Sequence, residues 1–125
     1  MALMENVVDA GPIPYREIAL CGDVDLEHGL RHAGFDPVDT MYRLIEIPLI
    51  AIQETASMPW RDMGTAYADA LKDGQEFPPI VVLRTRDGWA LLDGVNRTHA
   101  YFMLKRVSIH AYELLNGCWA QRRSP

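Results

Sequence analysis

The residues whose types and spacing could do chemistry lie at one turn, between Asp93 and Thr98. An apolar run precedes this turn and a helical pattern follows it, so the turn joins a strand to the start of a helix. A helix N-terminus presents backbone N–H groups and a partial positive charge, and it attracts anions, phosphate above all. Gly94 would let a ligand approach the backbone closely, and Arg97 could donate two hydrogen bonds to phosphate oxygens.

The carboxylate of Asp93 could hold a divalent metal ion or accept a proton from a substrate hydroxyl. A purely structural interpretation stays open for the same residues. Asp93 could cap the helix, Gly94 could relieve a tight turn, and Arg97 could lie in solvent. The pattern therefore makes this turn a candidate phosphate site, and it does not fix a reaction.

The elements around the turn can be predicted from the spacing of apolar residues and turn signals. Pro79 to Leu83 predicts a strand, Asp87-Gly88 predicts a hairpin turn, and Trp89 to Leu92 predicts the return strand. Apolar residues then recur at helical spacing, and Val107 to Leu114 predicts a last strand.

The first half of the chain predicts further elements of several kinds. They are a loose arm over Met1 to Ile13, a short strand over Tyr15 to Cys21, a helix over Asp25 to Ala33, a strand over Met41 to Ile47, and the clearest helix over Trp60 to Lys72.

Residues 78–82, 93–97 and 107–111 together resemble the ParB/sulfiredoxin-like domain, whose superfamily includes ParB N-terminal domains, sulfiredoxins and small free-amino-acid kinases. Its signature is a Gly-x-x-Arg turn at a helix N-terminus. Gly94 and Arg97 match that turn, and Asp93 matches the Asp-Gly start of the kinase-like members. The resemblance implies an α+β fold, a compact domain with a small mixed sheet flanked by helices and an N-terminal extension. The implied division is an extension over 1–40, a core over 41–115 and a tail over 116–125.

The resemblance also implies a ligand and a set of site residues. The ligand would be ATP or ADP, with CTP as an alternative, bound with Mg²⁺, and its phosphate would pass to a small hydroxyl compound. Glu54, in the loop after the first core strand, resembles a general base, and Arg61 in that loop could touch the phosphates; an ordinary helix start is the structural interpretation of both. The expected catalytic residues are Glu54 and Asp93, and the expected cofactor-binding residues are Gly94, Val95, Asn96, Arg97, Thr98 and Arg61.

The sequence departs from the superfamily's pattern directly after the glycine. Sulfiredoxins carry a nucleophilic Cys there, whereas this chain has Val95, which excludes reduction of sulfinic acids. Kinase-like members tend to carry His where Val95 and Asn96 stand. The alternative function is therefore a ParB-like module that senses a nucleotide and regulates a protein or DNA partner without turnover.

Composition bounds the remaining possibilities. The 125 residues are 49% hydrophobic and 23% charged, which is typical of one soluble globular domain. The net charge of −5 makes DNA a less expected partner, and a homodimer stays open. No run is apolar enough for a membrane span and the start lacks a basic leader, so a cytoplasmic location is expected. His28 and His32 could chelate zinc, but no third ligand is nearby, and no metal-binding residue is predicted.

Overall fold

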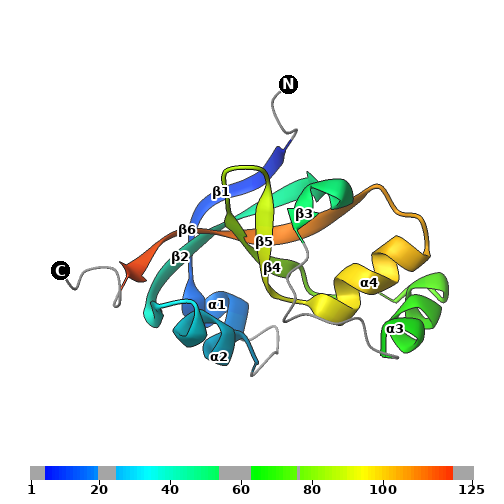
Figure 1. The fold of residues 1–125 in the computed structure, drawn as a ribbon, viewed down its shortest axis with the longest axis horizontal. Coiled ribbons are helices and arrows are strands. Elements are labelled where there is room, and N and C mark those ends of the chain that lie inside the picture. The colour runs from blue at the N-terminus through cyan, green and yellow to red at the C-terminus, as the bar shows by residue number, and fades with distance from the viewer. Residues whose placement is uncertain (1–4, 20–24, 54–62, 76, 120–125) are drawn as a thin grey trace.

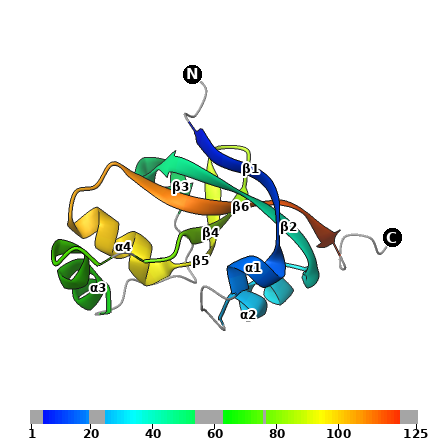
Figure 2. The same cartoon turned by 180° about the vertical axis from the view of Figure 1, so that it is seen from behind.

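The computed structural model describes residues 5–19, 25–53, 63–75 and 77–119. These residues form one mixed sheet in the order β1-β2-β6-β4-β5-β3, with helices packed against it (Figures 1 and 2). The elements are β1 (Asn6–Pro14), α1 (Tyr15–Ala19), α2 (Asp25–His32), β2 (Phe35–Pro48), η1 (Leu49–Ala51), β3 (Ile52–Gln53), α3 (Met63–Lys72), β4 (Ile80–Arg84), β5 (Trp89–Asp93), α4 (Val95–Met103) and β6 (Ser108–Trp119). None of the described helices combines the length and the apolar composition that crossing a membrane requires.

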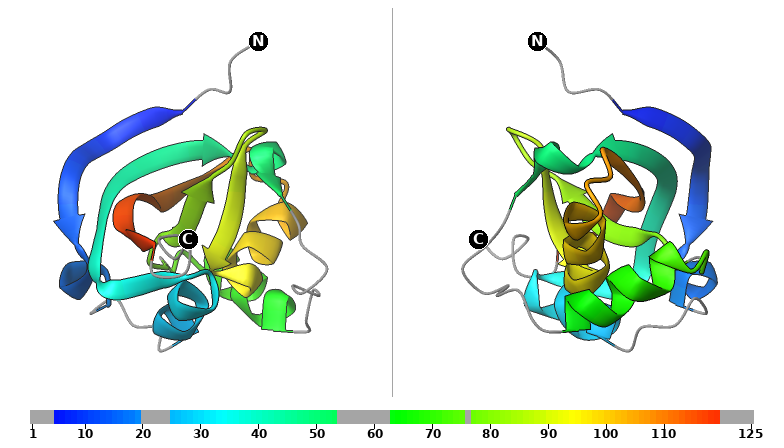
Figure 3. Two further views of the ribbon diagram at one scale, coloured as in Figure 1. Left: turned by 60° about the vertical axis from the view of Figure 1, so that its left-hand side comes forward. Right: turned by 90° about the vertical axis from the view of Figure 1, so that its right-hand side faces the viewer.

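The sheet is built from two antiparallel units that β6 joins. β1 pairs with β2, and β4 pairs with β5 through a turn closed by a 2.8 Å hydrogen bond from the amide of Thr85 to the carbonyl of Gly88. β6 lies between the units, antiparallel to β2 and parallel to β4. Figure 3 shows that the sheet is strongly curved and that β1 follows the bend of β2 on the outside. The end of β5, which leads into α4, is held by the pairing of Asp93 with Val81 on β4.

Side chains alternate between the two faces of the sheet, and each face has its own apolar cluster. On β4, Ile80 and Val82 belong to the cluster that α4 covers with Val95 and Tyr101. Val81 belongs to the cluster on the opposite face, where α1 and α2 contribute Ile18, Leu26 and Leu30. The third cluster joins α3 to α4 through Ala68, Leu71 and Ala100.

Several predictions from sequence are confirmed by these elements. The strands predicted over Pro79 to Leu83 and Trp89 to Leu92 are observed as β4 and β5, each within one residue of the predicted ends. The helix after Gly94 and the last strand are also present, although β6 runs on to Trp119. The helices predicted at 25–33 and 60–72 are observed as α2 and α3.

Two predictions near the N-terminus are wrong. The expected loose arm contains strand β1, because Pro12 and Pro14 are tolerated on an edge strand. The expected strand over Tyr15 to Cys21 begins instead with helix α1. Apolar residues at 15, 18 and 19 have helical spacing, and Ile18 is buried on that helix.

A network of charged side chains crosses one end of the sheet, on the face of the first apolar cluster. Glu113 is 4% exposed and accepts hydrogen bonds of 2.6 Å from Trp89 Nε1 and from Arg43 Nε. Arg43 and Arg84 both pair with Glu5, and Arg84 lies 5.1 Å from the ring centroid of Trp89. Burial lowers the pKa of Arg43, but the hydrogen bond and charge of Glu113, together with Glu5, outweigh it and raise that pKa. The network therefore ties β2, β4, β5 and β6 together by charge.

The opposite face holds a buried tyrosine whose ionisation should make stability depend on pH. The hydroxyl of Tyr42 donates to Thr40 Oγ1 at 2.9 Å, and burial raises the pKa of Tyr42 from 10.0 to about 12. The unfolded chain therefore releases the Tyr42 proton at a lower pH than the folded protein does. The stability that the protonated tyrosine contributes is complete below about pH 10 and is lost as the pH rises through about 12. We expect a loss on the order of 2 kcal/mol in the free energy of unfolding, measured with urea. Tyr42→Phe should lack this part of the pH dependence, and an identical pH profile in the variant would contradict the assignment.

Candidate functional site

The turn between β5 and α4 has a geometry that only glycine suits. Gly94 is the N-cap of α4 and has φ 110° and ψ 32°, in the left-handed region. A Cβ atom at this position would lie 2.5 Å from Cγ2 of Ile80 and 3.2 Å from Nη2 of Arg97. The glycine thus allows β4, β5 and α4 to meet closely. Packing against Ile80 is sufficient to explain why this position holds a glycine.

Arg97 is the residue that fastens this turn to the preceding strand. Its guanidinium donates from Nη1 to the carbonyls of Pro78 and Pro79, at 2.9 and 3.1 Å, and from Nη2 to Asp93 Oδ2 at 3.0 Å. The side chains of Arg97 and Asp93 are each 10% exposed. The idea that Arg97 lies in solvent is therefore wrong, and its charge is balanced by a carboxylate four residues earlier.

The remaining cofactor-binding candidates occupy the first turn of the same helix. Thr98 is buried, and both its amide and its hydroxyl donate to the carbonyl of Gly94, at 2.9 and 2.8 Å. Val95 packs against the first apolar cluster, and Asn96 is half-buried. The amide of Thr98 makes the first hydrogen bond of the helix, so the amides of residues 95–97 lie ahead of it at the positive end.

The structure brings together six of the eight site residues expected from sequence. Asp93, Gly94, Val95, Asn96, Arg97 and Thr98 form one continuous turn at the end of β5. The other two, Glu54 and Arg61, lie outside the described residues.

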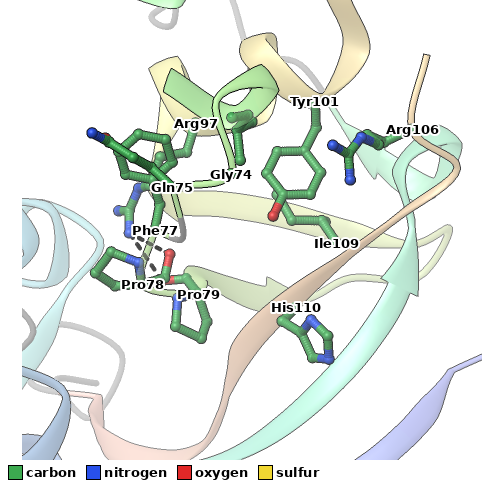
Figure 4. Close-up of a pocket in the computed structure, with 11 residues that line it drawn as sticks. Gly74, Gln75, Phe77, Pro78, Pro79, Arg97, Tyr101, Arg106, Ile109 and His110 are labelled. Atoms are coloured by element: carbon green, nitrogen blue, oxygen red, sulfur yellow. Dashed lines mark hydrogen bonds between the residues drawn. The ribbon is translucent and has the colours of Figure 1, made fainter. Parts of the chain in front are cut away.

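A cavity of about 470 Å³ adjoins Arg97, between the end of α3, the helix α4 and the start of β6 (Figure 4). Tyr101, Arg106 and His110 contribute polar groups to it. Sequence reasoning missed this cavity, because its walls come from segments far apart in the chain. The signal that could have found it is the Arg97–Tyr101 spacing of four, which places both side chains on one face of α4.

No protein-family model matches the sequence, and no curated protein matches it. Among solved structures, the Pnob8-like ParB-N domain aligns with a TM-score of 0.53 and 14% identity over 67% of this chain and 34% of that chain. Sulfiredoxin from Arabidopsis thaliana aligns with a TM-score of 0.49 and 18% identity over 56% of this chain and 82% of that chain.

The truncated chromosome-partitioning protein ParB from Caulobacter crescentus, solved with CTP-γ-S, aligns with a TM-score of 0.47 and 18% identity. That alignment covers 62% of this chain and 47% of the ParB chain. This chain thus matches about a third of the ParB-N chain and under half of the Caulobacter chain. The domain has a ParB/sulfiredoxin-like fold, as the sequence resemblance predicts.

Proposed function

We propose that this domain binds a nucleotide through its phosphate groups at the first turn of α4. The observation that carries the proposal is the position of three backbone amides, those of Val95, Asn96 and Arg97, ahead of the first hydrogen bond of the helix. These amides lie at the positive end of a nine-residue helix, where phosphate is a favoured ligand. The match of residues 93–97 to the Asp-Gly-x-x-Arg pattern supports the same assignment.

In this proposal Arg97 acts mainly as a positioning residue. Its hydrogen bonds to the carbonyls of Pro78 and Pro79 hold the turn against the strand β4, which fixes the direction of the helix. The carboxylate of Asp93 pairs with Arg97 through Oδ2. A carboxylate has further lone pairs on both of its oxygens, so Asp93 can keep this pairing while it holds a metal ion or accepts a proton. No group of three or more His, Cys, Asp or Glu side chains gathers in the described part of the chain. Mg²⁺ usually binds through one or two carboxylates together with phosphate oxygens of the nucleotide.

The reaction that we propose for bound ATP or ADP is transfer of its terminal phosphate to a small hydroxyl compound. The hydroxyl oxygen forms the new bond to phosphorus, the bond to the departing nucleotide breaks, and Glu54 takes the hydroxyl proton. The alternative is a module that binds nucleotide without turnover and regulates a partner. Glu54→Gln separates the two, because a phosphotransferase should keep nucleotide affinity and lose product formation in this variant, whereas a module forms no product in either protein.

Nucleotide binding can be tested by thermal unfolding with ATP, ADP, CTP and GTP, each with Mg²⁺. A ligand at a hundredfold excess over its dissociation constant should stabilise the protein by about 2.7 kcal/mol. Asn96→Asp adds a negative charge beside the phosphates, and we expect it to abolish this stabilisation. The same charge favours the helix N-terminus itself, so the variant should remain folded.

Asn6→Asp is the matched control, because it makes the same change at an exposed residue of β1. Nucleotide stabilisation should be unchanged in this variant. Equal nucleotide stabilisation of wild type and Asn96→Asp, or no stabilisation of wild type by any of the four nucleotides, would contradict the proposed site.

A further inference from the structure

The cavity beside α4 combines apolar walls with cationic groups. Its apolar lining includes Leu71 at the end of α3, Phe77 and Pro79 in the link to β4, and Ile109 on β6. Figure 4 shows the ring of Tyr101 standing between Arg106 and Gly74, with its hydroxyl directed toward Ile109. A volume of about 470 Å³ lies within the range of small-molecule sites, and the exposed lining of this cavity is more polar than apolar.

The charge in this cavity is positive. Arg106 lines it, and none of its described lining residues is an Asp or Glu. Arg97 also lines it, but Asp93 balances that guanidinium. Arg106, in contrast, has no ion pair with any carboxylate in the described part of the chain, and its guanidinium carbon lies 6.0 Å from the ring centroid of Tyr101. The cavity therefore offers an unbalanced positive charge at its edge.

The backbone after α4 is what places Arg106 there. The amide of Arg106 bonds to the carbonyl of Tyr101, and the amide of Lys105 bonds to that of Phe102, both at 3.0 Å. This is the Schellman pattern, which sets the residue after the left-handed position against the helix side chain five residues earlier. Lys105 occupies the left-handed position with φ 58°, the one positive value among the described non-glycine residues. A lysine there carries a conformational cost that glycine would avoid.

We propose that this cavity binds a small organic anion, a carboxylate or a phosphate monoester carried on a flat ring. The ring lies against the apolar walls near Phe77 and Tyr101, and the anionic group pairs with Arg106 at the rim, beside His110. The cavity shares Arg97 with the first turn of α4, but neither Val95 nor Asn96 lines it. It requires a ligand with both an apolar ring and an anionic group, because the lining offers both apolar and cationic side chains.

The test is a titration of ¹⁵N-labelled protein, followed by NMR, with phenyl phosphate, benzoate, inorganic phosphate and benzyl alcohol as probes. Phenyl phosphate and benzoate should bind saturably and shift the amide signals of Gly74, Tyr101 and Ile109. Inorganic phosphate and benzyl alcohol, which each carry one part, should bind at least about tenfold more weakly.

Arg106→Gln should weaken phenyl phosphate binding by about tenfold or more, since it removes a charge-assisted hydrogen bond. Arg86→Gln is the matched control, because it removes the same charge from an exposed residue in the β4–β5 turn. If phenyl phosphate bound equally weakly to both variants, the effect would come from overall charge, and the proposal would be overturned. Amide shifts that do not saturate, or that are confined to residues 94–98, would also overturn it. Asn96→Asp should leave phenyl phosphate binding unchanged, so this proposal and the nucleotide proposal can fail separately.

Discussion

Gly94→Ala is expected to lower the free energy of unfolding by about 3 kcal/mol, measured by urea denaturation. Two costs add at this position. A non-glycine residue at φ 110° is strained, and its Cβ would lie 2.5 Å from Cγ2 and 2.9 Å from Cβ of Ile80. Ile80 is itself fully buried, so it has little room to move away.

Gly74→Ala separates these two costs. Gly74 also has a positive φ, of 89°, but no atom lies within 4 Å of the place that a Cβ added to it would take. This control should lose only the conformational part, about 1 kcal/mol. A loss in Gly94→Ala no greater than that in Gly74→Ala would show that the contact with Ile80 is relieved by movement. The close meeting of β4 and α4 would then not depend on the glycine.

Glu113→Ala is expected to have the largest effect on stability, a loss of about 3–5 kcal/mol. The substitution removes the acceptor for Trp89 Nε1 and Arg43 Nε at a position that is 4% exposed. It also leaves a cavity in place of the side chain and leaves Arg43 with less compensating charge. Urea or thermal unfolding of the variant measures the loss.

Two further variants make the Glu113 prediction specific. Glu113→Gln keeps the volume and an acceptor for Trp89 and should lose less than Glu113→Ala. Glu27→Ala removes an exposed carboxylate whose distance to Arg31 is 4.0 Å, and it should change stability by no more than about 0.5 kcal/mol. If Glu113→Ala lowered the free energy of unfolding by as little as Glu27→Ala, the charged network would not be needed for stability.

The unit from β4 to β6 could be predicted from sequence because its signals are local. A β-branched run, the Asp87-Gly88 turn and a glycine before a helical pattern each specify structure within a few residues. The same logic fails at β1, where Gly11-Pro12 and Pro14 predict a break in regular structure. Pairing with β2 overrides that local preference at the edge of the sheet.

The partners of the site residues could not be predicted, because they come from distant segments. The bonds of Arg97 to Pro78 and Pro79 span 19 and 18 residues and involve carbonyls, which carry no sequence signal. The pairing of Glu113 with Arg43 spans 70 residues, and a charged residue on a strand is usually expected to face water. The spacing of Asp93 and Arg97 is visible in the sequence, yet spacing alone does not show that the two side chains pair with each other.

The central position of β6 means that this strand has only one usable alignment with its neighbours. Side chains on a strand alternate between faces, so sliding β6 by a single residue along β2 and β4 would exchange every inward and outward position. The carboxylate of Glu113 would then enter the apolar cluster around Tyr42, and Ala111 would give up its buried place to a neighbour as polar as His110. A charge buried near the middle of the strand thus selects a single register, and that choice keeps Ile109 and His110, at the start of the strand, in the lining of the cavity.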